Sequence, residues 1–310
     1  MYLVMSDKTT ISTFELFRMF PDADSGRAYF EGRRWPNGAT CPKCGEVKRV
    51  KARKNGFYRC NPCRFDFTVR TGTIFERSHV PLHKWIYAMY LLVTSRKGVS
   101  SLQLAKEIGV TQKTAWFLLQ RLREACGNDL AVLQGIVEVD ECYIGGKEKS
   151  KHAKKKRNKG RGPSGKTPVV GMRERGGRTK AMPVPNTGKS TLHRVVTSSV
   201  DPSSTVHTDE HKSYQGIGQS FVEHAAINHS VGEYVRDNVH TNGIESVWAV
   251  LKRGLHGVYH HASVKHLGRY INEFTFRLND GNVKRHTMER ISSLSEAAFG
   301  RRITYKTLTA

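Results

Sequence analysis

Three acidic side chains have surroundings that suit catalysis better than a solvated surface. Asp140 lies inside the apolar run IVEVDECYI, where an unpaired charge is costly to bury. Asp209 ends a second apolar run, STVHTD, and Glu245 lies in HTNGIESVWAVLKRGLHGVYHH, whose apolar residues repeat at helical spacing. Carboxylate oxygens bind hard cations such as Mg²⁺, and two such ions assist phosphodiester cleavage. The three acids are therefore candidate magnesium ligands, although each one alone also fits a surface or capping role.

Two further acids flank Asp140 along the same run. Side chains alternate between the two faces of a strand, so Glu138 and Cys142 should share the face of Asp140. We expect Glu138 to lie behind the metal ligands and support them. Glu141 is expected to be a surface acid on the opposite face.

Four cysteines have the spacing of a structural zinc site. Cys41 and Cys44 form one Cys-x-x-Cys pair, Cys60 and Cys63 form another, and fifteen residues separate the pairs. Two tight turns at this spacing bring four thiolates round one tetrahedral ion. The segment between the pairs has too little apolar mass to fold without metal. We therefore predict one zinc ion in a zinc ribbon, in preference to disulfides or a redox pair.

The charge balance indicates a polyanionic partner. The 310 residues include 51 Lys and Arg against 27 Asp and Glu, a formal net charge of +24 that a compact chain tolerates best against nucleic acid. The longest apolar stretch, Trp85 to Val93, is shorter than the roughly 20 residues that span a bilayer. The N-terminus lacks the pattern of a secretory signal. We therefore expect no membrane partner and a cytoplasmic, nucleoid-associated protein with reduced thiols.

Residues 147–166 concentrate this charge, with ten Lys or Arg and one Glu. The segment has nothing apolar to bury, so we expect a loop that is disordered in isolation. It is either solvated surface or a contact to DNA phosphates, and the charge of the whole chain favours phosphates. The residues expected to make these contacts are Lys154, Lys155, Lys156 and Arg157.

The segment SSLQLAKEIGVTQKTAWFLLQRLREA predicts two short helices joined by a tight turn. Ser100 or Ser101 can cap the first helix, Gly109 ends it, and Thr111 can cap the second. A preceding helix should run from Pro81 to about Thr94, because its apolar residues also repeat at helical spacing.

The two short helices match a helix-turn-helix pattern, with an ordinary helical hairpin as the alternative. The residues expected to face inward are Leu102, Ala105, Ile108, Ala115, Leu118, Leu119 and Leu122. Gln112, Lys113 and Arg121 are then expected to face outward and contact DNA.

After Gly135 the sequence changes to short apolar runs. VEVDECYI, TPVVGMRE and TKAMPVP read as strands, and they are followed by a helix over about 188–199 and a further strand, STVHTD. This order predicts an α/β domain with the acids on its strands and on the following helix.

Taken together, these segments resemble a known family, the bacterial insertion-sequence transposases of the D-D-E type with an N-terminal zinc ribbon. The resemblance runs from about Cys41 to Asn279 and rests on the ribbon, the helix pair, VEVDECYIGG, HTDEHKSY and HTNGIESVWAVLKRGLHGVYHH. It implies a ribonuclease H-like catalytic domain with a mixed sheet.

The resemblance also assigns roles to individual residues. Asp140, Asp209 and Glu245 would bind two Mg²⁺ ions, or Mn²⁺ in their place, and Lys252 would contact DNA near the transposon end. Some relatives use an asparagine as the third residue, so Asn242 is the alternative to Glu245. We favour Glu245 because a charged carboxylate binds Mg²⁺ better than an amide does.

The resulting hypothesis is a DNA transposase that binds terminal inverted repeats and performs Mg²⁺-dependent cleavage and strand transfer, as a homodimer or higher multimer on DNA. The rival hypothesis is a DNA-binding regulator on a scaffold that no longer catalyses. The expected domains are a helical segment at 1–36, a zinc ribbon at 37–75, a helix-turn-helix domain at 76–130, a catalytic domain at 131–285 and a tail at 286–310.

Overall fold

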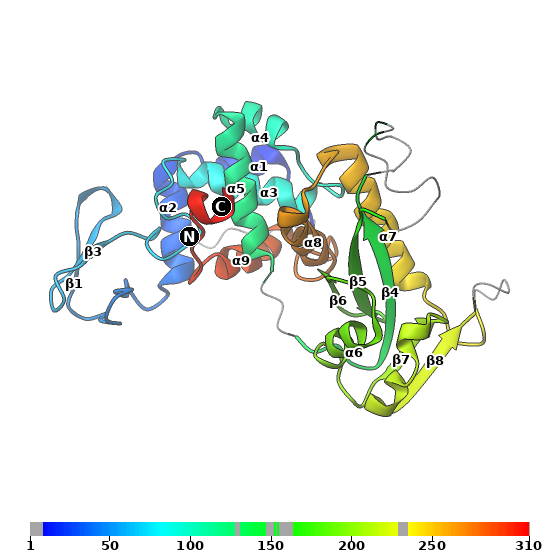
Figure 1. The fold of residues 1–310 in the computed structure, drawn as a ribbon. Helices are drawn as coiled ribbons and strands as arrows, with labels where there is room; N and C mark the ends of the chain where they lie inside the picture. Colours follow the sequence, from blue (N-terminus) through cyan, green and yellow to red (C-terminus); the bar gives the residue numbers. More distant parts are fainter. Residues whose placement is uncertain are drawn as a thin grey trace. The chain divides into compact units, whose positions relative to one another are not determined.

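A computed structural model describes residues 9–127, 131–146, 152, 154, 164–228 and 235–309. The chain forms two compact units, one of residues 1–128 with 280–310 and the other of residues 129–279 (Figure 1). Among the described residues, no helix is both long and apolar enough to cross a membrane.

The first unit is built round a buried helix, α3 (Leu82–Thr94), which packs against α2 (Ala23–Arg34) and α9 (Thr287–Ala297). α3 is apolar on nearly every side, and Trp85, Ile86 and Met89 are at most 1% exposed. The surrounding helices are α1 (Thr13–Met19), α2 (Ala23–Arg34), α9 (Thr287–Ala297) and α10 (Tyr305–Thr309).

The C-terminal segment differs from the tail expected at 286–310. Residues 287–297 form α9, whose Ile291 and Leu294 are fully buried. These apolar side chains are spaced along one face of the helix, and the helix packs against α2, α3 and α5 (Gln112–Ala125). Burial of this face makes the C-terminal segment part of the first unit.

The predicted helix pair forms as α4 (Ser101–Ile108) and α5 (Gln112–Ala125). The hydroxyl of Ser100 accepts the N–H of Gln103, and Gly109 ends α4 in the left-handed conformation that favours glycine. The side chain of Thr111 caps α5.

Six of the seven expected inward residues of this pair are buried, but two other expectations are wrong. Leu102 is 63% exposed, and Leu104 takes its place in the core. Arg121, expected on the outer face, is 6% exposed and donates to the carbonyl oxygen of Ile74 at 2.9 Å. Its guanidinium also lies over the ring of Phe117, so the side chain is covered by the unit instead of standing on its outer surface.

The ribbon consists of three short antiparallel strands, β1 (Val50–Ala52), β2 (Tyr58–Cys60) and β3 (Asp66–Phe67). Asn55 and Gly56 turn the chain between β1 and β2, both with positive φ. Trp35, at the end of α2, packs edge-on against Tyr58 and Phe67. This aromatic contact attaches the ribbon to the helices before it.

The second unit contains a mixed five-stranded sheet in the order β6-β5-β4-β7-β8. β4 pairs antiparallel with β5 and parallel with β7, and β7 pairs parallel with β8. These directions are those of a ribonuclease H-like sheet, so the fold class predicted from the sequence is confirmed. The strands are β4 (Ile136–Ile144), β5 (Thr167–Glu174), β6 (Thr179–Pro183), β7 (Thr205–Asp209) and β8 (Glu223–Ile227).

Helices cover both faces of this sheet (Figure 1). α6 (Lys189–Thr197) packs on one face through Leu192 and Val196. α7 (Asn242–Gly254) and α8 (Val264–Leu278) cover the other face, with Trp248 and Leu267 in its core. The sheet and α7 together carry the three acids predicted as metal ligands.

Candidate active site and zinc centre

The four ribbon cysteines form one compact cluster. Sγ of Cys41 and Cys63 are 3.6 Å apart, those of Cys44 and Cys60 are 3.6 Å apart, and those of Cys44 and Cys63 are 3.5 Å apart. A tetrahedral ion with bonds of about 2.3 Å to sulfur requires sulfur separations of about 3.8 Å. The four thiols therefore fit a single zinc ion, as the spacing predicted.

Asp140 and Asp209 meet because of the register between two parallel strands. Glu138 of β4 pairs with His207 of β7, and each aspartate lies two residues further along its own strand. Parallel neighbours are only about 4.8 Å apart, so both side chains reach the same edge of the sheet. The N–H of His211 donates to Oδ1 of Asp209 at 3.0 Å and holds that carboxylate in place.

Glu141 joins these two aspartates, which corrects its expected place on the surface. One ligand oxygen from each of Asp140, Glu141 and Asp209 lies within 4.8 Å of the others. Glu141 is only partly exposed, and its Oε1 accepts the hydroxyl of the buried Tyr214 at 2.6 Å. Strand alternation alone missed this because β4 extends beyond its pairing with β7, where helical residues such as Tyr214 enclose its other face.

Burial, together with the neighbouring acids, disfavours the charged forms of Asp140 and Glu141. Burial raises the pKa of Asp140 to about 6, and the nearby charges of Asp209 and Glu245 raise it further. Burial likewise raises the pKa of Glu141 to about 7, with contributions from Asp209 and Asp140 that the Tyr214 hydrogen bond partly offsets. A divalent cation among these oxygens would relieve the repulsion, so the donor set fits the predicted metal.

Trp248 of α7 orients Asp140. Its Nε1 donates to Oδ2 of Asp140 at 2.9 Å across 108 residues of sequence. The indole lies against Gly171 of β5, where a Cβ atom would come within 2.4 Å of the ring. A glycine inside a strand marks close approach of another group, and this was the available sequence signal for the contact.

Glu245 lies in the first turn of α7, exposed to solvent and with its Oε1 accepting the hydroxyl of Thr241 at 3.2 Å. It is outside the group of acids whose oxygens lie within 4.8 Å of one another in the described part of the chain. It is still close enough for its charge to raise the pKa of Asp140. Asn242, the alternative, occupies the first position of α7 and is also exposed.

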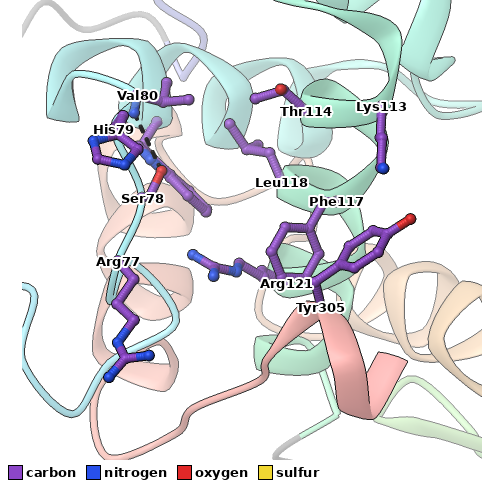
Figure 2. Close-up of a pocket in the computed structure, with 11 residues that line it drawn as sticks. Arg77, Ser78, His79, Val80, Lys113, Thr114, Phe117, Leu118, Arg121 and Tyr305 are labelled. Atoms are coloured by element: carbon purple, nitrogen blue, oxygen red, sulfur yellow. Dashed lines mark hydrogen bonds between the residues drawn. The ribbon is translucent and has the colours of Figure 1, made fainter. Parts of the chain in front are cut away.

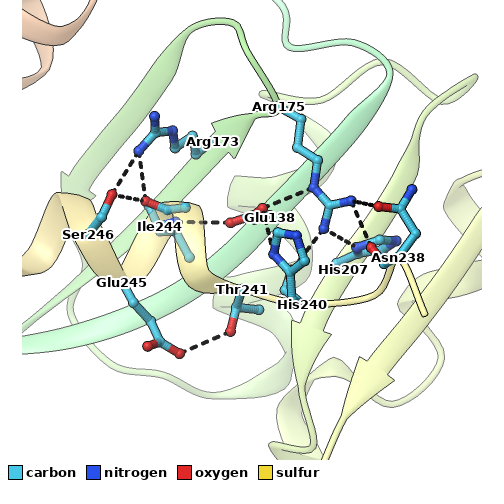
Figure 3. A network of polar contacts seen from close by, with 11 residues as sticks. Glu138, Arg173, Arg175, His207, Asn238, His240, Thr241, Ile244, Glu245 and Ser246 are labelled. Carbon is cyan, nitrogen blue, oxygen red and sulfur yellow. Dashed lines mark hydrogen bonds and ion pairs between the residues drawn. The ribbon is translucent and has the colours of Figure 1, made fainter. Parts of the chain in front are cut away.

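Glu138 lies behind the site, almost completely buried, in a network of polar contacts (Figure 3). Its Oε1 accepts Nε of Arg175 at 3.1 Å, and its Oε2 accepts the N–H of Ile244 at 3.0 Å. His240 Nδ1 lies 3.3 Å from Oε1, close enough for an ion pair when protonated but outside hydrogen-bonding geometry. Sequence alternation placed Glu138 on the correct face, whereas its partners could not be predicted.

The expected DNA-contacting residues of α5 have different environments. Gln112 and Lys113 are exposed at the start of the helix. Lys113 also lies over the ring of Tyr305 and lines a cavity of about 280 Å³ in the first unit (Figure 2). Arg121 lines the same cavity, and burial lowers its pKa to about 10. Among the described residues that line this cavity, the charged ones are all basic.

A second basic cavity, of about 420 Å³, lies in the second unit. Lys252, exposed in the last turn of α7, lines it together with Lys166 and His256, His260 and His261. Of the four basic-loop residues predicted to contact phosphates, Lys154 is exposed, while Lys155, Lys156 and Arg157 lie outside the described residues.

Two family models match the chain, an ISXO2-like transposase domain at residues 132–279 and a transposase zinc-ribbon domain at residues 21–65. The chain is 31% identical over 258 residues to an "Uncharacterized protein in transposable element ISH50" of Halobacterium salinarum, a match that covers 79% of this chain and 86% of that protein. It is 32% identical over 101 residues to an "Uncharacterized transposase-like protein" of Haemophilus influenzae, covering 33% of this chain and 80% of that protein.

Among solved structures, the Mos1 strand transfer complex matches with a TM-score of 0.29 and 13% identity, over 68% of this chain and 75% of that chain, which is too weak to support a conclusion. Because the ISH50 relative is archaeal, the matches do not restrict the family to bacteria. The chain belongs to the ISXO2-like family of DDE transposases, with a transposase zinc ribbon ahead of its catalytic domain.

Proposed function

We propose that this transposase binds the terminal inverted repeats of its element and performs Mg²⁺-dependent DNA cleavage and strand transfer. The observation that carries the proposal is the register of β4 and β7, which brings Asp140 and Asp209 to one edge of the sheet of a DDE transposase domain. Glu245, on the first turn of α7, is the proposed third ligand.

In this proposal, two bound Mg²⁺ or Mn²⁺ ions would supply activation of the attacking oxygen and stabilisation of the leaving oxygen. The chain would hold them through Asp140, Asp209 and Glu245. Trp248 fixes the orientation of the Asp140 carboxylate, and the N–H of His211 fixes that of Asp209. Glu141, bound to Tyr214, lies close enough to contribute a further oxygen.

The proposed chemistry consists of a hydrolysis followed by a transesterification. Water attacks a phosphorus at the transposon end, the P–O3′ bond breaks, and a free 3′-hydroxyl results. That hydroxyl then attacks a phosphorus of the target, forming one P–O bond as another breaks. The first step replaces an ester bond with a P–O bond to the oxygen of water, and the second replaces one ester bond with another, so no nucleotide energy source is required.

The DNA contacts proposed for this reaction come from both units. In the first unit, Gln112 and Lys113 are exposed at the start of α5, the position that reads bases in a helix-turn-helix. In the second unit, Lys252 lines a cavity, and the charged residues that line it in the described part of the chain are basic. We propose that the basic loop adds phosphate contacts, that the protein is associated with the nucleoid, and that it acts as a homodimer or higher multimer on DNA.

The test is a Mg²⁺-dependent nicking assay on DNA that carries the element's ends, paired with a gel-shift assay. Asp140→Asn, Asp209→Asn and Glu245→Gln keep the side-chain shape but remove a metal-binding charge. We expect each to retain the affinity of the parent for end DNA and to lose nicking. Asn242→Ala and Glu141→Gln are the matched comparisons for the third ligand.

The outcomes separate the alternatives. If Glu245→Gln cuts normally and Asn242→Ala is inactive, Asn242 is the third ligand. If Glu245→Gln cuts normally and Glu141→Gln is inactive, the third ligand is Glu141. If every variant, including the aspartate variants, cuts like the parent, the catalytic proposal is wrong and a DNA-binding regulator on a non-catalytic scaffold takes its place.

A further inference from the structure

Glu138 is a carboxylate that is 1% exposed at the centre of the second unit. Both of its oxygens have donors, Arg175 Nε on one and the backbone N–H of Ile244 on the other (Figure 3). A buried charge with good geometry at both oxygens is expensive to disturb, because removing a partner leaves the rest of the group unpaired. The position of Glu138 is therefore firmly tied to Ile244.

Ile244 lies in the first turn of α7, where helical N–H groups have no partner within the helix. A side chain of the capping residue usually accepts one of them. Here the capping residue Thr241 donates its hydroxyl to Glu245, and Glu138 of the distant strand β4 accepts the N–H of Ile244 instead. A negative charge at this end of a helix is also favoured by the helix dipole.

Neighbouring contacts fix the same turn to the sheet. Arg173 of β5 donates to the carbonyl oxygen of Gly243 at 2.8 Å and to Oγ of Ser246 at 2.9 Å. Gly243 packs directly on Glu138, and a Cβ atom there would lie 2.6 Å from Oε2. Arg175, held by Glu138, also donates to the carbonyl oxygen of Asn238 in the segment that leads into α7.

We propose that Glu138 is a positioning residue that sets the place of Glu245 relative to Asp140 and Asp209. Glu245 directly follows Ile244, whose N–H Glu138 accepts. Glu138 precedes Asp140 by two residues on β4, and it pairs with His207, which precedes Asp209 by two residues on β7. The buried carboxylate of Glu138 thus fixes the start of α7, which carries Glu245, to the part of the sheet that carries Asp140 and Asp209. This inference rests on the proposed role of Glu245 as the third ligand.

The test uses Glu138→Gln in the full chain. The new amide presents one oxygen and one NH₂ group, so either the Ile244 N–H or the Arg175 Nε–H would face another donor. Mn²⁺ binding is measured by calorimetric titration without DNA, and Mg²⁺ dependence is measured in the nicking assay. We expect about tenfold weaker Mn²⁺ binding, as for other groups that orient metal ligands. Raised Mg²⁺ should restore nicking to Glu138→Gln but not to Glu245→Gln.

A second variant and a matched control separate positioning from general loss of stability. Gly243→Ala leaves every charge in place and favours helix formation, but its Cβ atom would push the Glu138 carboxylate away from the Ile244 N–H. It should weaken Mn²⁺ binding in the same direction. Glu273→Gln removes another fully buried, ion-paired carboxylate, on α8, which also accepts the hydroxyl of Tyr259. It should lower stability without changing Mn²⁺ affinity.

The results distinguish this inference from the proposed function. If Glu245→Gln loses metal binding and nicking while Glu138→Gln or Gly243→Ala keeps the parental Mn²⁺ affinity, the positioning inference alone is wrong. The positioning inference is also wrong if the nicking activity of Glu138→Gln falls only as much as the fraction of folded protein falls. If Glu245→Gln binds Mn²⁺ and cuts like the parent, the third-ligand proposal is wrong, and the inference falls with it.

Discussion

Three acidic side chains lie close together at the edge of the sheet, those of Asp140, Glu141 and Asp209. Hydrogen bonds from neighbouring groups offset the cost of burying them only in part. Trp248, Tyr214 and the N–H of His211 each supply one hydrogen bond. The raised pKa values of Asp140 and Glu141 show that these bonds do not offset burial and mutual repulsion. Repulsion among such acids lowers the stability of the metal-free protein, and the same repulsion favours binding of a cation.

We therefore expect Asp140→Asn to stabilise the protein when EDTA is present. Because burial raises the pKa of Asp140 to about 6, its ionised form at pH 7 disfavours the folded state, by roughly 1–3 kcal/mol. Thermal unfolding followed by circular dichroism should show a higher melting temperature for the variant. Asp237→Asn, a change in an exposed loop, is the control and should have no effect. A lower melting temperature for Asp140→Asn than for the parent would contradict this account.

At the scale of elements, local signals in the sequence were reliable. Hydrophobic periodicity and capping residues predicted α3, α4 and α5 within one or two residues, because a cap acts within its own first turn. The burial of Arg121 was missed, since periodicity gives a helix face but not the neighbour that covers it. In this case the covering groups are Ile74 and Phe117.

The ribbon is the element with the sharpest test. Four thiols with sulfur separations of 3.5 and 3.6 Å predict one tightly bound zinc per chain. Cys41→Ser should lower the zinc content measured by atomic absorption and unfold the ribbon, because its strands are too short to fold without metal. Mn²⁺ binding by the carboxylates should persist. The Cys126→Ser variant, changed outside the cluster, should contain as much zinc as the parent. Less than about half an equivalent of zinc per chain in the parent would contradict the zinc site.

At the scale of the whole molecule, the first unit combines both ends of the chain. Residues near 10 and near 290 meet, as in the hydrogen bond from the Thr287 N–H to the carbonyl oxygen of Thr9. The buried guanidinium of Arg290 also donates to the carbonyl oxygen of Val93 at 2.6 Å. A segment expected to be a tail is thus required to close the core round α3.

Leu294→Ala tests this closure. The side chain is fully buried on α9, so its truncation should cost about 2–5 kcal/mol of unfolding free energy in the first unit. Limited proteolysis with mass spectrometry should show earlier cleavage within residues 9–127 and unchanged protection of the second unit. Glu289→Ala, on the exposed face of the same helix, should change stability by less than about 0.5 kcal/mol. Equal protection of the two variants would show that α9 is dispensable.

The net charge of +24 makes a prediction about affinity for DNA. The logarithm of the binding constant should fall steeply with the logarithm of salt concentration, because bound phosphates release counterions. Deleting residues 149–165 should make this slope shallower on DNA of any sequence. Fluorescence anisotropy over a range of salt concentrations measures the slope. An unchanged slope would assign the basic loop to solvated surface.

The sequence alone determined the zinc ligands, four of the five strands of the catalytic domain with its helices α6 and α7, and the two aspartates that meet at the edge of its sheet; β8 and α8 were not predicted. These features follow from residue types at fixed spacing and from periodicities that act over a few residues. Only the tertiary structure decided that Glu141 joins the aspartates, that α9 completes the first unit, and that Glu138 holds the first turn of α7. Each of these contacts joins elements that are distant in sequence, Glu138 and Ile244 being 106 residues apart. Such contacts depend on how the faces of helices and sheets pack against one another, and a pattern within a short stretch of sequence does not determine that packing.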